Sequence, residues 1–401
     1  MKILKEGLIY LIGELLAKIL PFLMLPYLTR KLGPDGFGEL SYFMTWLALF
    51  SIFIGFSQEG AITRYYYFYG KKALNTVVKA GYLFNFIVSA ILLVICWLLK
   101  AEIMAYVVLA AMFQSLVNVQ LALRQCQQQP LKYISIQFIL SLFNVGATIA
   151  ALEYFSQDLV VYRILAIVLA NVLTFVIASV VLGDLFRPKR GLKTRQLKTS
   201  LLYIISFGLP LLLHQSSFFL KGQLDRLFIY EKYSKFDLGL YSAGVQIALV
   251  LPVIFMALNK AIIPHYYKGL KNNELSLKKI KTYTIYAIPL SILPAVISWI
   301  MPEKLYTWFL GQEYLGVKYY VVMYLVAYGL NFPYLILVNY FFYFAKNKII
   351  SIITFSTSLV YVILLIFTSE ISIYYIPYAL IFSNLLMVII LWITIRKIQI
   401  T

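Results

Sequence analysis

The stretch GLIYLIGELLAKILPFLMLPYL, residues 7–28, decides the fold class of this chain. It has the length of about 20 mostly apolar residues that a helix needs to cross the hydrocarbon core of a membrane. Glu14 and Lys18 interrupt it, and their spacing of four residues puts both side chains on one helix face. A charge at this depth costs roughly 2.5–3.5 kcal/mol on insertion scales, so the pair needs a partner, a water-filled cavity or a functional role. No small-residue cleavage site follows, and we expect this helix to be retained rather than removed as a signal peptide.

The rest of the chain has the composition of a protein that crosses a membrane many times. Of its 401 residues, 62% are hydrophobic, 17% are aromatic and 13% are charged, and the mean hydropathy is +0.84. Soluble domains are apolar at roughly 45–50% of positions, which this chain far exceeds. We predict an all-α polytopic membrane protein of about twelve spans. The apolar windows lie at 7–28, 37–58, 76–98, 103–124, 134–153, 159–182, 206–229, 238–259, 282–301, 317–338, 349–368 and 372–395.

The basic residues, which give the chain a net charge of +19, are distributed unevenly between the two predicted sides of the membrane. If both termini lie in the cytoplasm, 24 of the 35 Lys and Arg residues fall in cytoplasmic segments and nine fall on the opposite side, with Lys18 and Arg163 inside spans. This asymmetry follows the positive-inside rule, so we predict cytoplasmic N- and C-termini. The basic segments then face anionic lipid headgroups, and no nucleic-acid partner is expected.

Sequence signatures of catalysis are missing from the chain: GxxxxGK[ST], GxGxxG, HExxH and GxSxG do not occur. Cys96 and Cys126 fall in or beside different predicted spans, so they form neither a disulfide framework nor a CxxC metal site. The predicted loops opposite the termini are short and leave no domain for a catalytic site. We therefore expect no enzyme activity, no cofactor and no metal site, with energy supplied by an ion gradient or by consumption of the substrate.

The chain is predicted to consist of two halves. The basic connection GDLFRPKRGLKTRQLKTS, residues 183–200, separates an N-terminal six-helix bundle, 1–182, from a C-terminal six-helix bundle, 201–401. An ungapped offset of 201 positions aligns Gly7 with Gly208, Gly38 with Gly239, Ser41 with Ser242, and Tyr65-Tyr66 with Tyr266-Tyr267. Six spans per half keep the copies in the same orientation, as in transporters that rock two halves around a site at the midplane.

The first predicted helix of each half carries candidate functional residues. Glu14 and Lys18 are interpreted either as a self-neutralised pair or as the wall of a central aqueous chamber, in which Lys18 attracts an anion and Glu14 holds a cation. The span at 206–229 carries His214, Lys221 and Asp225, with Lys221 and Asp225 again four residues apart. They form a second buried acid–base pair in a shared chamber, or, if the helix ends near Leu220, they lie among headgroups. His214 is either a hydrogen-bonded bundle residue or a proton switch.

Basic residues also mark the predicted cytoplasmic exits of two spans. Glu59 and Arg64 follow the span at 37–58, and Lys260 and His265 occupy the equivalent exit of the span at 238–259. Arg64 and Lys260 could contact a phosphate group that enters from the cytoplasm. Interfacial anchoring explains them equally well, because Lys and Arg are common at membrane surfaces.

Two segments resemble a known family. LPYLTRKLGPDGFGELSYF, residues 25–43, and LDRLFIYEKYSKFDLGLYSAG, residues 224–244, resemble the polysaccharide-type flippases of the multidrug/oligosaccharidyl-lipid/polysaccharide exporter superfamily, in particular Wzx-like O-antigen flippases. The resemblance implies twelve spans in two bundles, alternating access, a bacterial cytoplasmic membrane, and an undecaprenyl-pyrophosphate-linked oligosaccharide as cargo.

The resemblance also implies site residues and partners. Chamber cations that bind the pyrophosphate correspond to Lys18, Lys221 and Arg64, and candidates for coupling to H⁺ or Na⁺ are Glu14 and Asp225. A polymerase and a chain-length regulator of the same pathway are the implied protein partners, beside membrane lipids.

Three other classes of membrane protein would show part of these sequence features. A drug/cation antiporter of the same superfamily would have the same fold, but acidic or apolar chamber walls are expected there rather than buried Lys. An integral membrane polymerase or ligase would also have many spans, but it normally needs a sizeable outward loop with catalytic Arg or Asp. A channel or a purely structural membrane protein does not account for two equivalent halves.

Overall fold

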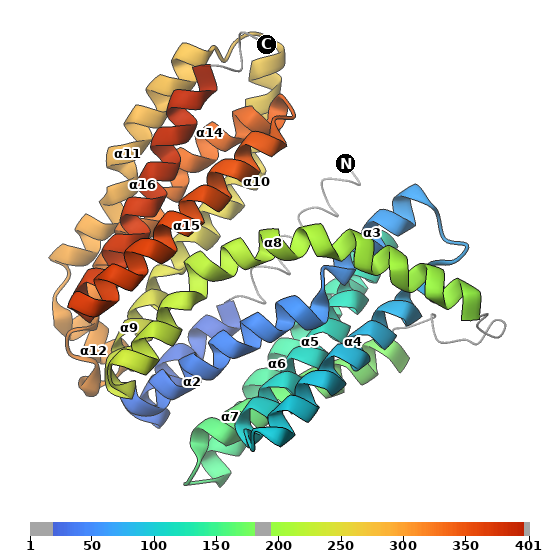
Figure 1. Ribbon diagram of the computed structural model, residues 1–401. Coiled ribbons are helices and arrows are strands. Elements are labelled where there is room, and N and C mark those ends of the chain that lie inside the picture. Colours follow the sequence, from blue (N-terminus) through green and yellow to red (C-terminus); the bar gives the residue numbers. More distant parts are fainter. Residues whose placement is uncertain (1–18, 181–193, 397–401) are drawn as a thin grey trace. The chain divides into compact units, whose positions relative to one another are not determined.

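A computed structural model describes residues 19–180 and 194–396, and these residues form helices with no strand among them (Figure 1). The helices of the N-terminal part are α2 (Leu25–Gly55), α3 (Gln58–Phe68), α4 (Leu74–Leu98), α5 (Glu102–Cys126), α6 (Pro130–Tyr154) and α7 (Leu159–Val180). The remaining helices are α8 (Thr194–Lys232), α9 (Lys235–Ala248), α10 (Val250–Lys271), α11 (Leu277–Ile300), α12 (Glu303–Leu310), η1 (Gln312–Tyr314), α13 (Val317–Gly329), α14 (Asn331–Tyr343), α15 (Asn347–Ile371), η2 (Ile373–Tyr375) and α16 (Ile376–Thr394).

The predicted all-α membrane architecture is confirmed. In the part of the chain that the structure describes, ten segments are long and apolar enough to cross a membrane, and there are eleven if the two parts of α8 count as one span. They correspond to the predicted spans from 37–58 onward. The predicted first span, 7–28, lies outside the described residues as far as residue 18, and so do Glu14 and Lys18. The side on which the termini lie stays a prediction.

The chain packs as two compact units, and each unit includes a short segment from the other half of the sequence. Among the described residues, the first unit comprises 19–32, 40–180 and 194–216, and the second comprises Gly33–Glu39 and 217–396. The first half of α8 therefore packs with the first unit, and the turn within α2 packs with the second. Of the predicted basic connection at 183–200, residues 183–193 lie outside the described residues, and the division into bundles at that connection stays a prediction.

The first unit is built around α5, which packs against α3, α4 and α7. Its buried face is rich in small residues, including Ala110, Ala111 and Ser115. Helices in a membrane gain little from hydrophobic burial, so close approach between backbones at small residues is a main source of their packing energy. Larger buried residues such as Leu116 and Leu123 fill the space toward α3 and α4.

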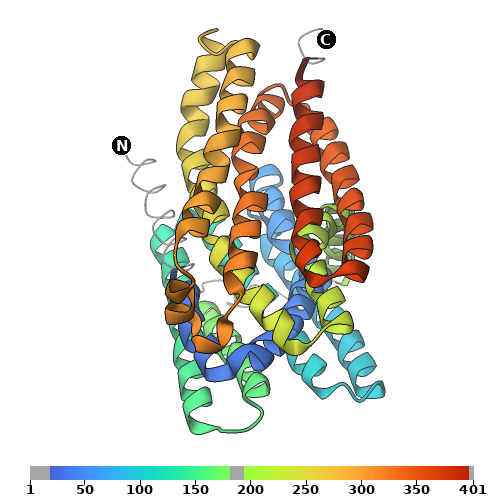
Figure 2. The same cartoon turned by 90° about the vertical axis from the view of Figure 1, so that its left-hand side faces the viewer.

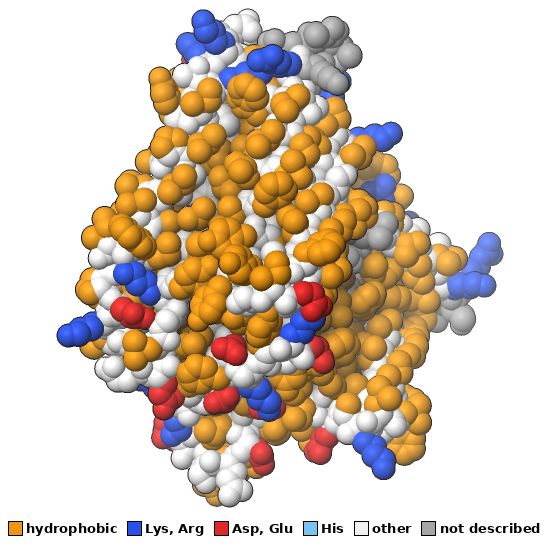
Figure 3. All heavy atoms as spheres, turned by 60° about the vertical axis from the view of Figure 1, so that its left-hand side comes forward, with side chains coloured by type: hydrophobic (Ala, Val, Ile, Leu, Met, Phe, Trp, Pro, Cys, Tyr) orange, Lys and Arg blue, Asp and Glu red, His pale blue; other side chains and the backbone are white. Residues whose placement is uncertain are grey.

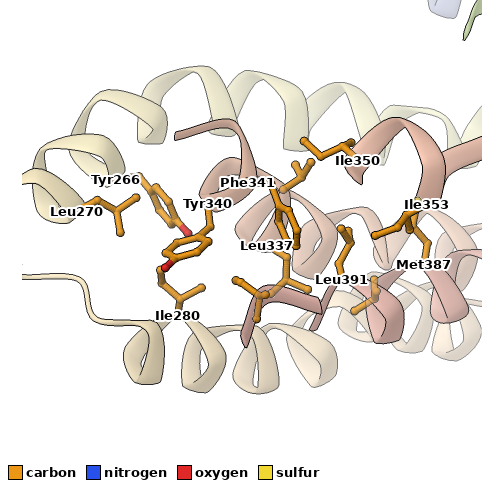
Figure 4. Packing of buried hydrophobic residues seen from close by; sticks show 13 residues of the cluster. Tyr266, Leu270, Ile280, Leu337, Tyr340, Phe341, Ile350, Ile353, Met387 and Leu391 are labelled. Carbon is orange, nitrogen blue, oxygen red and sulfur yellow. The ribbon is translucent and has the colours of Figure 1, made fainter. Parts of the chain in front are cut away.

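The second unit has a core made by α10, α11, α14, α15 and α16 (Figure 4). Phe341, Leu337 and Leu391 are fully buried in it, and Tyr266 contributes its ring while its hydroxyl donates to the Ile336 carbonyl at 2.9 Å. α15 and α16 run side by side (Figure 2). Hydrophobic side chains cover the middle of this unit's surface, and charged side chains gather toward its ends (Figure 3). This banding is expected for helices that cross a bilayer.

Several spans are broken at internal positions. α9 and α10 are separated at Leu249, and α13 and α14 at Leu330. Pro252 lies three residues after the first break, and Pro333 lies three residues after the second. A proline within a helix removes a backbone hydrogen bond and crowds the preceding turn, which accounts for both breaks. The break between α2 and α3 is different, since Phe56 and Ser57 are both in the left-handed region without a proline or glycine at either position.

Candidate functional site

Lys221 lies on α8 in the second unit, where it is half-buried and touches two other helices. Its Nζ donates to Oγ1 of Thr357 on α15 at 3.1 Å and to Oδ1 of Asn384 on α16 at 3.5 Å. The amide nitrogen of Asn384 in turn donates to the Ala327 carbonyl at 3.0 Å, which fixes the orientation of the amide. A cation is thus held by neutral oxygens from two helices that pack against each other.

Asp225 lies one turn further along α8 and is only 2% exposed. Its carboxylate accepts hydrogen bonds from the hydroxyl of Tyr324 on α13 at 2.9 Å, from the hydroxyl of Tyr241 on α9, and from the backbone N–H of Arg226 at 2.9 Å. The two tyrosine hydroxyls also contact each other. The negative charge is therefore surrounded by hydrogen-bond donors, which is how a buried carboxylate avoids the cost of desolvation.

The predicted acid–base pair between Lys221 and Asp225 does not form. The two side chains bind different partners, and among the described residues no carboxylate lies within ion-pair distance of Lys221. The buried guanidinium of Arg226 supplies a positive charge near Asp225, while its own Nη1 donates to the Gly222 carbonyl at 3.0 Å. The helix does not end near Leu220, because α8 continues to Lys232. The location of the two side chains among lipid headgroups, which that alternative also proposed, stays a prediction.

The other predicted cations occupy different places. Arg64 lies on α3 in the first unit, where it is exposed and its guanidinium sits 5.2 Å from the ring centre of Phe68 and 6.0 Å from that of Tyr203. Lys260 is exposed on α10 in the second unit, and His214 is exposed on α8 in the part that packs with the first unit. Lys221 and Asp225 are thus the only predicted site residues that the described structure brings together on one helix of one unit.

Several polar residues at this site were not predicted. Tyr241 belongs to the segment 224–244 that carries the family resemblance, but its role depends on tertiary contacts with Asp225 that no sequence spacing reveals. Thr357 lies in the run Ser356–Ser358 of α15, and Asn384 follows Ser383 in α16. These polar runs inside predicted spans are the signal that could have identified them.

Arg163 is a half-buried cation of the first unit that the sequence analysis did not select as a site residue. Nη2 of Arg163 on α7 donates to Oδ1 of Asn144 on α6 at 3.1 Å. Its Nε and Nη1 atoms are buried and have no hydrogen-bond partner among the described residues. Elsewhere in the same unit, Lys31 and Glu153 form an exposed ion pair at 2.9 Å, and Tyr27 donates to the same carboxylate at 2.8 Å.

An apolar cavity of about 680 Å³ lies within the second unit. Its walls come from α9 to α14, and Phe255 on α10 stacks against Phe332 on α14 at its side, with ring centres 5.3 Å apart. Most other wall residues are aliphatic, among them Leu258, Leu293 and Leu325. Such a cavity suits a hydrocarbon chain rather than a sugar. The described residues hold no group of three or more His, Cys, Asp or Glu side chains placed to bind a metal.

Comparisons with known proteins agree with this architecture. Residues 3–270 match the model of the family described as "Polysaccharide biosynthesis protein". A protein of the Lsg locus of Haemophilus influenzae is 46% identical over 402 residues, which is 100% of this chain and 99% of that protein. A second H. influenzae protein, described as an uncharacterized membrane protein, is 44% identical over 382 residues, which cover 94% of this chain and 93% of its own.

Solved structures share the fold at low sequence identity. The lipid II flippase MurJ in an inward closed conformation matches with a TM-score of 0.72 at 11% identity, covering 97% of this chain and 87% of its own. An inward-facing multidrug resistance transporter of the MATE family, from the MOP superfamily, matches with a TM-score of 0.65 at 15% identity and covers 96% and 94% of the two chains. These structures establish a fold shared with MOP superfamily transporters.

Proposed function

Because this chain belongs to the polysaccharide biosynthesis protein family, we propose that it is a flippase that moves a lipid-linked oligosaccharide across a membrane by alternating access. The cargo that fits best is an undecaprenyl-pyrophosphate-linked oligosaccharide, the repeat unit of an O-antigen, capsule or other exopolysaccharide. The proposed location is the cytoplasmic membrane of a bacterium, where a polymerase and a chain-length regulator of the same pathway act on the product.

The observation that carries the proposal is the half-buried ammonium of Lys221, held by the neutral oxygens of Thr357 and Asn384 within a membrane-crossing unit. A diphosphate with several sugars cannot cross about 30 Å of hydrocarbon unaided. A lysine is a compact point charge that binds phosphate oxygens, and neutral partners leave its charge uncompensated for such a ligand. Lys18, Arg64 and Lys260 are further proposed contacts of the pyrophosphate, at different stages of its passage.

We take a proton as the coupling ion at Asp225. The Tyr241 and Tyr324 hydroxyls and the Arg226 N–H donate to its carboxylate oxygens, and a tyrosine hydroxyl can also accept a hydrogen bond from the protonated carboxyl group. Taking up a proton at Asp225 removes the charge that the two tyrosine hydroxyls stabilise, and this couples the protonation state to the packing of α8 against α9 and α13. Glu14 and His214 remain candidates for the same role.

The apolar cavity of the second unit provides a place for part of the polyprenyl chain. Its aliphatic and aromatic walls match a branched hydrocarbon, while the headgroup needs the polar residues of α8, α15 and α16. On this account the tail stays in an apolar environment as the headgroup passes. No chemical bond is formed or broken, so the activity is transport and not catalysis.

A MATE-like drug exporter is the second candidate, because a MATE transporter shares the fold. A cell experiment separates the two. Deletion of the gene should abolish surface polysaccharide and cause lipid-linked repeat units to accumulate in the cytoplasmic leaflet, and expression of the chain from a plasmid should reverse both effects. Normal surface polysaccharide in the deletion strain, together with increased sensitivity to cationic drugs, would favour the exporter and reject the flippase.

A further inference from the structure

Three nitrogen-bearing side chains meet at one end of the second unit, near the start of α11 and the end of α16. Nζ of Lys281 on α11 lies 4.4 Å from the ring centre of Trp392 on α16, and the guanidinium carbon of Arg396 lies 5.5 Å from the ring centre of the same tryptophan. The ring therefore brings the two cations within about 10 Å of each other, which is the Debye length at 0.1 M salt. Like charges at this distance repel each other, and an anion beside them offsets that repulsion.

The polar atoms of this cluster lack acceptors. Nζ of Lys281 and Nε1 of Trp392 are buried and have no hydrogen-bond partner among the described residues. In the same part of the chain, neither Lys281 nor Arg396 takes part in an ion pair. Contact with the ring face offsets part of the cost of burying the ammonium group, but it leaves the indole N–H unsatisfied. Because every one of these groups is a donor, the missing partner is an acceptor.

The donors select an anion with several oxygens. Ammonium, guanidinium and indole groups donate hydrogen bonds and do not accept them, which excludes a metal cation. A phosphate group that accepts at about 2.8 Å on two of its oxygens joins donors roughly 8 Å apart, so one phosphate can reach both cations. Lys and Arg side chains gather at this end of the unit (Figure 3), and Glu274 is the one acidic residue in the sequence from 268 to 281.

The position of the cluster favours a phosphate that belongs to a lipid. Both helices are long and apolar enough to cross a membrane, and the cluster lies near their ends, where lipid headgroups are found. Ile285, one turn after Lys281, and Ile389, one turn before Trp392, are exposed and available to acyl chains. Basic pockets between membrane helices bind anionic headgroups in this way. A zwitterionic headgroup carries an ammonium group that both cations repel, so a lipid with a net negative charge is favoured.

We propose that Lys281, Trp392 and Arg396 bind the phosphate of an anionic phospholipid such as phosphatidylglycerol. The two cations pair with the phosphate oxygens, the indole N–H donates to one of them, and the acyl chains lie along α11 and α16. The bound lipid joins the start of one helix to the end of the other. This site does not depend on the identity of the transported molecule, and it uses none of the residues proposed to bind the cargo or to couple its transport.

The test is a titration of the purified full chain in detergent with phosphatidylglycerol that carries brominated acyl chains, which quench tryptophan fluorescence at short range. The contribution of Trp392 is the difference between the wild type and Trp392→Phe. We expect saturable quenching, with a half-saturating concentration about tenfold lower than that of brominated phosphatidylethanolamine. Sodium phosphate should displace the lipid no more than sodium chloride does at equal ionic strength. Equal half-saturation by the two lipids, or displacement by inorganic phosphate, would overturn the proposal and leave the transport proposal untouched, because no cargo is present.

Variants locate the site. Lys281→Gln and Arg396→Gln should each raise the half-saturating concentration of phosphatidylglycerol about tenfold, because each removes a charge-assisted hydrogen bond. Lys278→Gln is the matched control, since Lys278 is an exposed cation about one turn earlier on α11, and it should bind the lipid as the wild type does. Arg396 is exposed and follows the end of α16, so Arg396→Gln keeps the test decisive if Lys281→Gln fails to fold. Unchanged binding in Arg396→Gln, or an equal loss in Lys278→Gln, would reject the site.

Discussion

Gly38 and Gly239 meet in a reciprocal backbone contact. A Cβ atom on Gly38 would lie 2.0 Å from the carbonyl oxygen of Lys235, and a Cβ atom on Gly239 would lie 1.9 Å from the carbonyl oxygen of Pro34. The offset of 201 positions relates Gly38 to Gly239 and Pro34 to Lys235. Equivalent positions of the two halves therefore present the same atoms to each other, as in the interface of a two-fold symmetric dimer. This contact supports an internal duplication.

The same offset relates the starts of the two contacting helical segments. In α2 a non-helical residue, Gly33, has φ 65° and is followed by Pro34, while Ser234 caps α9 immediately before Lys235. An ion pair between Lys235 and Glu39, 3.0 Å apart, adds a contact beside the glycines. The turn Gly33–Glu39 thus belongs structurally to the second unit, although its neighbours on both sides belong to the first.

Gly38→Ala and Gly239→Ala should each destabilise the protein, because a methyl group would overlap a backbone oxygen that cannot move aside alone. Overpacking of this kind typically costs about 1–3 kcal/mol. The measurement is the melting temperature of the purified variants. Gly146→Ala on α6 is the matched control, since a Cβ there meets nothing within 4 Å and alanine is the better helix former. Melting temperatures as high as that of the control would contradict the close contact.

Lys221→Met should lower the rate of cargo transport at least tenfold while the protein still inserts and folds. The reason is loss of the positive charge that we propose to bind the diphosphate, with a side chain of similar length retained. Lys232→Met is the matched control on the same helix, because Lys232 contacts Ser369 at 3.1 Å and pairs with Glu370 rather than with the polar site. Wild-type transport by Lys221→Met would remove this residue from the substrate path.

Asp225→Asn should make transport independent of an imposed proton gradient. The amide has nearly the same shape as the carboxylate and still offers an acceptor to Tyr324, but it neither binds nor releases a proton in the relevant range. Transport is measured in vesicles with and without a pH difference across the membrane. Tyr324→Phe, which removes one donor to Asp225 without removing the carboxylate, should retain gradient dependence. Full dependence in Asp225→Asn would assign coupling to another residue.

Arg64→Gln should raise the cargo concentration needed for half-maximal transport several-fold and leave the maximal rate unchanged, since its exposed guanidinium is proposed to capture the headgroup. Lys71→Gln serves as the control, because Lys71 is another exposed cation of the first unit that lies over an aromatic ring, 5.3 Å from the ring centre of Tyr66. If both variants respond alike, Arg64 is an interfacial anchor and not a contact of the cargo.

Much of the fold could be predicted because hydrophobic length alone marks membrane helices. The spans predicted at 159–182 and 349–368 correspond closely to α7 and α15, Leu159–Val180 and Asn347–Ile371. The short helix α12, Glu303–Leu310, was predicted as part of a loop, since eight residues are too few to give a spanning signal. The break at Phe56 and Ser57 was also missed, because neither residue type favours a left-handed backbone.

The site was predicted less completely for a different physical reason. The spacing of Lys221 and Asp225 places them on one helix face, and a pair was expected for that reason. The neighbouring helices offer better partners, with Thr357 and Asn384 for the ammonium and Tyr241 and Tyr324 for the carboxylate. Contacts between helices decide how a buried charge is satisfied, and one sequence does not reveal which helices are neighbours.

Reconstitution into proteoliposomes tests the proposed transport most directly. Purified protein is incorporated into vesicles that contain undecaprenyl-pyrophosphate-linked oligosaccharide in both leaflets, and a membrane-impermeant glycosidase is added outside. We predict that digestion proceeds beyond the share of the outer leaflet to nearly the whole pool, at a rate that Lys221→Met lowers at least tenfold. Digestion that stops at the outer-leaflet share in vesicles with correctly folded wild-type protein, with and without a proton gradient, would contradict the account.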